Sequence, residues 1–256
     1  MSIGRKIATL REVYITFGIF EIFRLLWQKL RTSKHQESFK LKENSIRVLS
    51  SLDEVESYLI KNYPAPKLRN QKDYLEILSS IETVEHRNSF FDTNYDMGDL
   101  ALYSIFLILQ NIDRTTVLET GVAAGKSTTL ILKALTTMNK SDVVLVSTDI
   151  TNNCGELIPE NLKRQWIFRK LGFRAKRDFL SVLKFYEDVS IFIHDSDHSK
   201  EWEEFEVGSV IQHCSKLKFI VVDDVHESII HLLSESEWNL CLLQEEMKTS
   251  LLAIRV

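Results

Sequence analysis

The stretch from Val117 to Ser127 (VLETGVAAGKS) restricts the fold more than any other part of the sequence. A short apolar run ends in the acid Glu119, and a turn with two glycines and a helix-forming segment follow. In this order of strand, turn and helix, backbone N–H groups and a helix N-terminus face a ligand beyond the end of the strand. Glycine suits the turn because a residue without Cβ allows a sharp bend and lets a ligand approach the backbone closely.

Three kinds of ligand site share this pattern. A phosphate-binding P-loop would use Gly121, residues 125–127 and the acidic strand 220–224. It requires four residues between its first glycine and the Gly-Lys pair, whereas this chain has three. Glu119 would also repel a triphosphate. A dinucleotide site of the form G-x-G-x-x-G lacks its middle glycine. The third alternative is a site formed by an acid at the end of a strand, followed by Gly121, Gly125 and Ser127. This motif resembles the first motif of the class I S-adenosylmethionine-dependent methyltransferases.

Length and composition indicate an ordinary globular protein. The 256 residues are enough for one sizeable core with a small extra lobe, and 27% of them are charged. The net charge of −4 gives no reason to expect nucleic acid as a partner. The three cysteines (Cys154, Cys214 and Cys241) are too few and too scattered for a disulfide framework or a zinc site, so we expect a cytoplasmic location.

An apolar run from Val13 to Trp27 lies within residues 5–34 and has basic flanks, and Glu21 and Arg24 interrupt it. It is only about half to two-thirds as long as a membrane-spanning helix. No small-residue cleavage site of a signal peptide follows it. One alternative is a helix that packs on the domain or on a second subunit. The other is an amphipathic helix on anionic lipid, which would make the protein peripheral to the membrane.

The chain divides into two predicted regions. Residues 1–90 are expected to form a helical extension that serves as a lid, an oligomer contact or a membrane-surface contact. In residues 91–256, short apolar runs alternate with helical segments. Strands are predicted at 117–120, 143–147, 173–176, 190–194, 219–222, 240–244 and 250–256, and helices at 99–111, 126–138, 160–171, 180–186 and 202–214. This alternation predicts a doubly wound α/β domain with a mostly parallel sheet covered on both faces.

Acidic residues follow one predicted strand after another. They are Glu119, Asp149, Asp178, Asp195 with Asp197, and Asp223 with Asp224. Ligands of such a sheet bind outside the carboxyl ends of its strands. Asp149 lies 24 residues beyond Gly125 (149 − 125), a suitable distance for a carboxylate that binds ribose hydroxyls. Asp178 either faces the ligand or caps the next helix. Tyr95 and Met97, before the first helix of the domain, either cover the ligand or pack on the surface.

The sequence His194-Asp195-Ser196-Asp197-His198 and the pair Asp223-Asp224 follow two strands that are expected to be neighbours. Three carboxylates brought together would repel one another unless a cation compensated their charge. Oxygen ligands favour Mg²⁺, Mn²⁺ or Ca²⁺. A bound magnesium ion would lower the pKa of a substrate hydroxyl. His198 lies close enough in sequence to Asp195 to act as the base that takes the proton of this hydroxyl. The alternative is that these residues cap helices and pair with Lys200 or other basic groups.

The pattern Asp195-x-x-His198 followed by Asp223-Asp224 resembles the metal-dependent sugar O-methyltransferases of the macrocin and mycinamicin type and the related cephalosporin-hydroxylase-like group. The resemblance covers about residues 95–230. It implies that Asp195, Asp223 and Asp224 bind Mg²⁺ or Mn²⁺ and that His198 is the base. Two features depart from the family, because the turn lacks an additional glycine and Lys126 stands where a small residue is common.

The same resemblance implies a seven-stranded Rossmann-like methyltransferase sheet in a protein that is expected to form a homo-oligomer. The acceptor implied is a hydroxyl of a sugar, of another diol-bearing small molecule or of a glycan. The cofactor implied is S-adenosylmethionine, and its expected contacts are Glu119, Gly121, Ala123, Gly125, Ser127, Asp149, Asp178 and Asp195. Two other functions remain open: a P-loop-like nucleotide-binding protein, and a catalytically silent scaffold that binds S-adenosylmethionine.

Overall fold

The computed structural model describes residues 46–63, 70–82, 96–235, 237–246 and 248–256. The apolar run within residues 5–34 and Tyr95 lie outside the described residues, so the predicted lipid or subunit contact of that run stays a prediction. No helix within the described ranges is long and apolar enough to cross a membrane.

A single eight-stranded sheet forms the centre of the fold, with the strand order β1-β7-β8-β6-β5-β2-β3-β4. Neighbouring strands are parallel except that β8 is antiparallel to β6 and to β7. The strands are β1 (Arg47–Leu49), β2 (Thr116–Thr120), β3 (Val144–Asp149), β4 (Trp166–Lys170), β5 (Val189–His194), β6 (Phe219–Val222), β7 (Trp238–Gln244) and β8 (Thr249–Arg255).

The mostly parallel α/β sheet is confirmed, but the predicted number of seven strands was wrong. The additional strand, β1, comes from the region that was expected to be helical. It pairs with Cys241–Leu243 of β7 and covers backbone groups that would otherwise form a free sheet edge.

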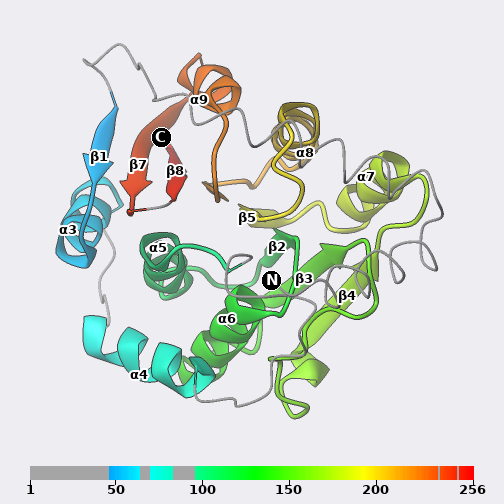
Figure 1. Ribbon diagram of the computed structural model, residues 1–256, viewed down its shortest axis with the longest axis horizontal. Coiled ribbons are helices and arrows are strands. Elements are labelled where there is room, and N and C mark those ends of the chain that lie inside the picture. Colours follow the sequence, from blue (N-terminus) through cyan, green and yellow to red (C-terminus); the bar gives the residue numbers. More distant parts are fainter. Residues whose placement is uncertain (1–45, 64–69, 83–95, 236, 247) are drawn as a thin grey trace, which may run out of the picture.

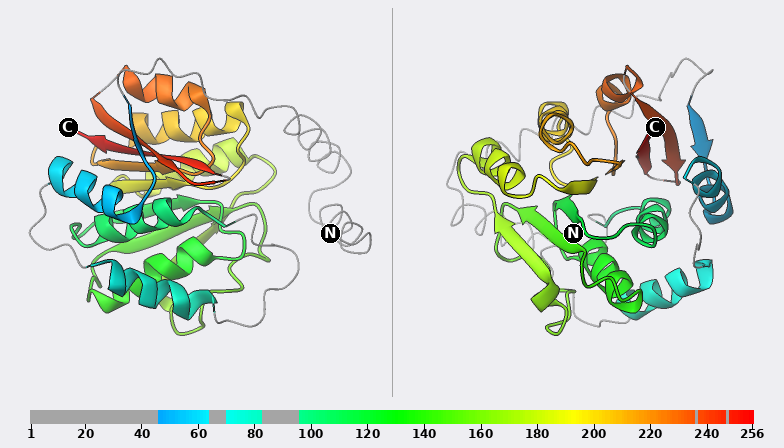
Figure 2. Two further views of the ribbon diagram at one scale, coloured as in Figure 1. Left: turned by 60° about the vertical axis from the view of Figure 1, so that its left-hand side comes forward. Right: turned by 180° about the vertical axis from the view of Figure 1, so that it is seen from behind.

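Helices cover both faces of the sheet (Figures 1 and 2). Helices α7, α8 and α9 lie on one face, and α3, α5 and α6 lie on the other, with α4 packed against α6. The helices are α3 (Leu52–Asn62), α4 (Gln71–Glu82), α5 (Asp99–Leu109), α6 (Lys126–Thr137), α7 (Ala175–Phe185), α8 (Lys200–His213) and α9 (Glu227–Ser234).

Each central strand contributes side chains to both hydrophobic clusters. Val117 belongs to the cluster beneath α5 and α6, whereas its neighbour Leu118 belongs to the cluster beneath α7 and α8. Ile191 and Phe192 divide in the same way. A strand that is buried on both faces has apolar residues without alternation, which explains why the sequence located these strands well. Met97 is also buried, in the first of these clusters.

The segment from residue 160 to residue 176 differs from the prediction of a helix followed by a strand. Only a short 3₁₀ helix (Lys163–Gln165) precedes β4, and α7 begins at Ala175. Residues that favour helices in this segment led to the wrong prediction of a helix. Trp166 and Phe168 favour a strand here, because large aromatic side chains pack well on a half-buried sheet edge. Trp166 Nε1 also donates to the Ser147 hydroxyl on β3, at 2.9 Å.

Two features of the topology determine where a ligand can bind. Strand β2 pairs with β3 on one side and with β5 on the other, so the chain leaves the end of β2 at a switch point of the sheet. Because β8 is antiparallel to β6, with Val222 opposite Leu251, the hairpin between β7 and β8 lies beside the carboxyl end of β6.

Candidate functional site

The glycine turn after β2 lies directly against the backbone that leaves β5. Gly121 has a φ of +81°, and a Cβ at this position would lie 1.9 Å from the carbonyl oxygen of Asp195. Gly125, the residue before α6, has a φ of +91°. Ala123 also has a positive φ, +46°. The turn therefore needs glycine at position 121 both for its dihedral angles and for its packing.

The carboxylate of Asp149 at the end of β3 faces the glycine turn. Its Oδ2 accepts hydrogen bonds from the backbone N–H groups of Val122 (2.9 Å) and Ala123 (3.2 Å), and its Oδ1 accepts one from Thr151 (3.0 Å). Burial raises the pKa of Asp149, and these three N–H donors oppose that rise. The residue predicted to bind ribose therefore lies beside the predicted cofactor turn, as expected for neighbouring strand ends.

The loop that follows β3 is fastened to the same turn. The Gly155 N–H donates to the Ala123 carbonyl (2.8 Å), and the Leu157 N–H donates to the Ala124 carbonyl (2.9 Å). Ala123 was predicted to be a cofactor contact, and that contact stays a prediction. In this structure its N–H and its carbonyl are both bonded within the protein, so Ala123 shapes the wall of the site.

Glu119 lies completely buried beneath the turn. Its Oε1 accepts a hydrogen bond from the Ser127 hydroxyl (2.6 Å), and its Oε2 accepts bonds from Thr128 (2.7 Å) and Ser147 (2.6 Å). Burial raises its pKa, and the three hydroxyls act in the opposite direction. Glu119 and Ser127, both predicted cofactor contacts, thus join the start of α6 to β3 from below.

Lys126, the first residue of α6, pairs with two acids. Its ammonium lies 3.9 Å from an Asp96 oxygen and 3.6 Å from an Asp99 oxygen, and only 11% of its side chain is exposed. It therefore connects α6 to the segment before α5. This contact explains how a largely buried lysine is accommodated at position 126.

Asp178 lies in the first turn of α7 and not directly after a strand. Its Oδ2 accepts a hydrogen bond from the Gly172 N–H at 2.8 Å and so holds the loop between β4 and α7. The alternative that Asp178 caps the next helix was wrong, because α7 begins before Asp178 and its N-cap is Arg174. A contact between Asp178 and adenine stays a prediction.

Asp195 and His198 lie just beyond β5. His198 Nε2 is 3.8 Å from Asp195 Oδ1, and 34% of the His198 side chain is exposed. Burial and the neighbouring His194 lower the pKa of His198 to about 4. Burial and the nearby Asp223 raise the pKa of Asp195 well above its usual range. At neutral pH His198 is therefore uncharged, the form in which an imidazole accepts a proton.

Asp223, at the end of β6, is fully buried and has protein partners for both carboxylate oxygens. Its Oδ1 accepts from the Ser250 hydroxyl (2.7 Å), and its Oδ2 lies 2.8 Å from the ammonium of Lys248. Asp224 is 41% exposed, and its Oδ2 is 3.8 Å from the same ammonium. Burial opposes the charge of Lys248, but Asp223, Asp224 and Asp195 together raise its pKa. The sequence pattern did not indicate Lys248.

The family resemblance implies magnesium at Asp195, Asp223 and Asp224. Within the part of the chain that the structure describes, no group of three or more His, Cys, Asp or Glu side chains is placed to hold a metal ion. Lys248 already interacts with Asp223 and Asp224. As arranged in this structure, the three carboxylates do not fit a magnesium site.

A buried polar cluster behind His198 was not predicted from the sequence. His194 Nδ1 lies 2.7 Å from Glu206 Oε2, which also accepts bonds from the hydroxyls of Thr120 (2.8 Å) and Ser196 (2.9 Å). The rings of His194 and His198 are edge to face, with their centroids 5.8 Å apart. Glu206 holds the ends of β2 and β5 together. Because Glu206 comes from α8, only the packing of this helix on the sheet shows this role.

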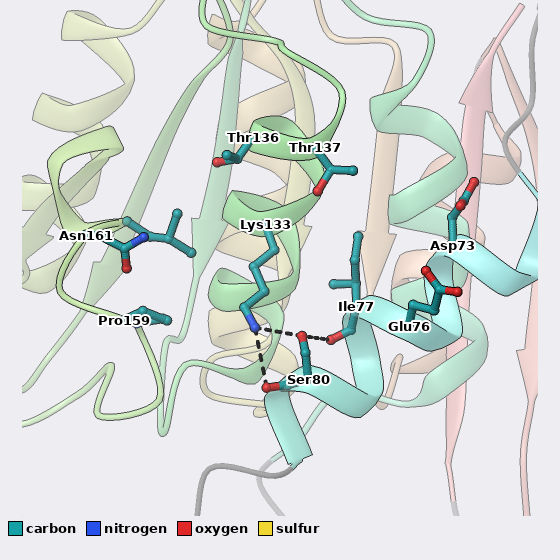
Figure 3. Close-up of a pocket in the computed structure, with 10 residues that line it drawn as sticks. Asp73, Glu76, Ile77, Ser80, Lys133, Thr136, Thr137, Pro159 and Asn161 are labelled. Atoms are coloured by element: carbon teal, nitrogen blue, oxygen red, sulfur yellow. Dashed lines mark hydrogen bonds between the residues drawn. The ribbon is translucent and has the colours of Figure 1, made fainter.

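A cavity of about 530 Å³ lies elsewhere, between α4, α6 and residues 159–162 (Figure 3). Lys133 lies in its wall and donates to the Ser80 hydroxyl at 2.6 Å, and burial lowers the pKa of Lys133. Thr136 and Thr137, also in the wall, end α6, whereas the glycine turn begins it. About 15 Å of helix separates these ends, so the cavity is distinct from the strand-end site.

The comparisons with known proteins agree with this geometry. A family described as a methyltransferase domain matches residues 118–225. An O-methyltransferase from Bacillus cereus, solved with S-adenosylhomocysteine, is 14% identical with a TM-score of 0.50, and the match covers 79% of this chain and 97% of that chain. TomG from Streptomyces achromogenes, an O-methyltransferase involved in tomaymycin synthesis and solved with S-adenosylmethionine, is 13% identical with a TM-score of 0.50, at 79% and 96% coverage.

A third structure is the MycE methyltransferase of the mycinamycin biosynthetic pathway, solved with Mg, S-adenosylhomocysteine and mycinamycin VI. It is 14% identical with a TM-score of 0.48, and the match covers 81% of this chain and 64% of that chain. No curated protein sequence matches this chain. At such low identities, the likeness to the solved structures is a likeness of fold.

Proposed function

Since residues 118–225 match a family described as a methyltransferase domain, we propose that the chain moves the methyl group of S-adenosylmethionine to a hydroxyl oxygen. The acceptor proposed is a sugar, another diol-bearing small molecule or a glycan. The observation that carries this proposal is the glycine turn at the switch point, with His198 beyond the adjacent strand β5. A cofactor bound at the turn and a base after β5 would then both lie at the carboxyl ends of neighbouring strands.

The turn and Asp149 supply the cofactor site. A carboxylate has about four positions at which it accepts hydrogen bonds, and Asp149 uses three of them on backbone N–H groups. Because the Ile150 N–H also bonds to this carboxylate, a ribose hydroxyl would share its oxygens with these donors. Asp149 would thus hold the turn in shape and bind the nucleoside at the same time.

The contacts of the turn argue against a phosphate loop. A phosphate loop directs its N–H groups and its lysine toward the phosphates. Here the N–H groups of Val122 and Ala123 face the carboxylate of Asp149, which would repel a phosphate. Lys126 is paired with Asp96, before α5, and with Asp99, the first residue of α5.

The proposed reaction is a direct methyl transfer. The acceptor oxygen attacks the methyl carbon, the bond from that carbon to the sulfonium breaks, and S-adenosylhomocysteine leaves. His198 takes the hydroxyl proton on its imidazole as the new bond to the methyl carbon forms. Positioning of the two partners supplies much of the rate. No step is assigned to magnesium, because the three carboxylates do not fit it as they are arranged.

S-adenosylmethionine and S-adenosylhomocysteine should each raise the thermal midpoint of the full-length protein. At about one hundred times the dissociation constant, a ligand stabilises the folded state by about 2.7 kcal/mol. Differential scanning fluorimetry with each compound, and with ATP plus Mg²⁺ as the comparison, measures this effect. A rise with Mg-ATP alone would contradict the proposal and favour a nucleotide-binding function.

Replacing Asp149 with alanine should weaken S-adenosylmethionine binding by about tenfold or more. The change removes a charged acceptor of three backbone N–H bonds, and each such bond contributes about 1.5–3 kcal/mol. Isothermal titration calorimetry measures the affinity. Asp142→Ala is the matched control, because Asp142 precedes the opposite end of β3. Equal affinities for the two variants would refute the role of Asp149.

A further inference from the structure

The hairpin between β7 and β8 brings a lysine to the carboxyl ends of the parallel strands. Val222 of β6 pairs with Leu251, and the Val225 N–H donates to the Thr249 carbonyl at 3.0 Å. The residues just before β8 therefore lie beside the loop that follows β6. Lys248 is the last residue before β8, so its side chain starts next to Asp223 and Asp224.

The ammonium of Lys248 interacts with protein oxygens from two directions. It lies 2.8 Å from Asp223 Oδ2 and 3.8 Å from Asp224 Oδ2, and it donates to the backbone carbonyl of Asp96 at 2.5 Å. Only 20% of the side chain is exposed. An ammonium has three N–H donors and a single positive charge. Lys248 thus supplies charge to the acids after β6 and also fixes the segment before α5.

The oxygens of Asp223 leave little opportunity for a second cation. Oδ2 is bound to Lys248, and Oδ1 accepts from Ser250 and, at 3.4 Å, from the Gly98 N–H. Magnesium requires near-octahedral oxygen ligands at about 2.0–2.1 Å. To reach Asp223, the ion would have to displace Lys248 and leave a half-buried ammonium beside a divalent charge. Like charges at that separation repel strongly where water is scarce.

We propose that Lys248 takes the place of the divalent cation among Asp195, Asp223 and Asp224, so that methyl transfer by this chain needs no divalent metal. This inference rests on the proposed methyl transfer. Lys248 is a positioning residue: it compensates the carboxylates after β6 and holds the segment before α5 across the strand ends. The acceptor hydroxyl then lies next to His198 and the protein carboxylates instead of a metal ion.

The test is a titration of the full-length protein with Mn²⁺, followed by electron paramagnetic resonance in the presence of S-adenosylmethionine. We expect no specific Mn²⁺ binding by the wild-type protein or by Lys248→Arg, which keeps the charge. Lys248→Met should gain specific Mn²⁺ binding, at least about tenfold above the non-specific background of the wild-type protein, because the carboxylates lose their counter-charge and a repelling cation is gone. Adding Asp224→Asn to Lys248→Met should remove most of that gain. A residue that only stabilised the fold would not create a metal signal.

Two results would overturn the inference. One is Mn²⁺ binding by the wild-type protein that Asp224→Asn abolishes, and the other is a folded Lys248→Met that gains no Mn²⁺ binding. If Lys248→Met does not fold, the wild-type titration decides alone. Asp224→Asn serves as the comparison there because Asp224 is 41% exposed and its replacement should leave the fold intact. Calorimetry with S-adenosylmethionine on the same samples tests the proposed function separately. If S-adenosylmethionine does not bind, methyl transfer is refuted, whatever the Mn²⁺ result.

Discussion

Replacing Gly121 with alanine should destabilise the protein by roughly 3 kcal/mol or more and abolish S-adenosylmethionine binding. A residue with a Cβ costs about 1–2 kcal/mol in the left-handed region, and Gly121 has a φ of +81°. The new Cβ would also lie 1.9 Å from the Asp195 carbonyl oxygen. A backbone atom cannot rotate away as a side chain can, so β5 and the turn must separate. Such overpacking costs about 1–3 kcal/mol more.

Urea unfolding and calorimetry measure the two effects of Gly121→Ala. Gly208→Ala is the matched control, because a Cβ at position 208, within α8, meets no atom within 4 Å. Alanine is a better helix former than glycine by about 1 kcal/mol, so Gly208→Ala should leave stability unchanged or raise it. Equal stability of Gly121→Ala and the wild-type protein would show that the turn does not rest against β5.

Glu119→Ala should cost about 3–5 kcal/mol of folding free energy. The change leaves the hydroxyls of Ser127, Thr128 and Ser147 without their buried acceptor. An unsatisfied buried group costs about 1–3 kcal/mol, and the lost side chain leaves a cavity as well. Because Ser127 and Thr128 begin α6, S-adenosylmethionine affinity should fall together with stability.

Glu119→Gln separates the hydrogen bonds from the volume of the side chain. Glutamine keeps the shape and one acceptor oxygen, so we expect about half of the destabilisation found for alanine, measured by the same urea titration. An unfolding free energy of Glu119→Ala within about 0.5 kcal/mol of the wild-type value, the range of ordinary surface substitutions, would contradict the bracing role. Loss of cofactor binding without loss of stability would instead indicate direct contact with the ligand.

Local patterns predicted most of the central fold. The glycine turn, α6 and the strands β2, β5 and β6 were located within about two residues, because a strand buried on both faces has an uninterrupted apolar run. The positions of Asp195 and Asp223 after neighbouring strands follow from the same pattern. Edge strands are harder to predict. β4 is only half-buried and was mistaken for a helix, and β1 is three residues long.

The sequence alone determined that this is a doubly wound α/β protein with a glycine turn after Val117-Leu118-Glu119, since those signals depend on residues close together in the chain. The tertiary structure decided the electrostatics of the site. Asp223 and Lys248 are 25 residues apart, and they meet only because β8 runs antiparallel to β6. The sign of the charge beside the strand-end carboxylates depends on that pairing, and no local pattern encodes it.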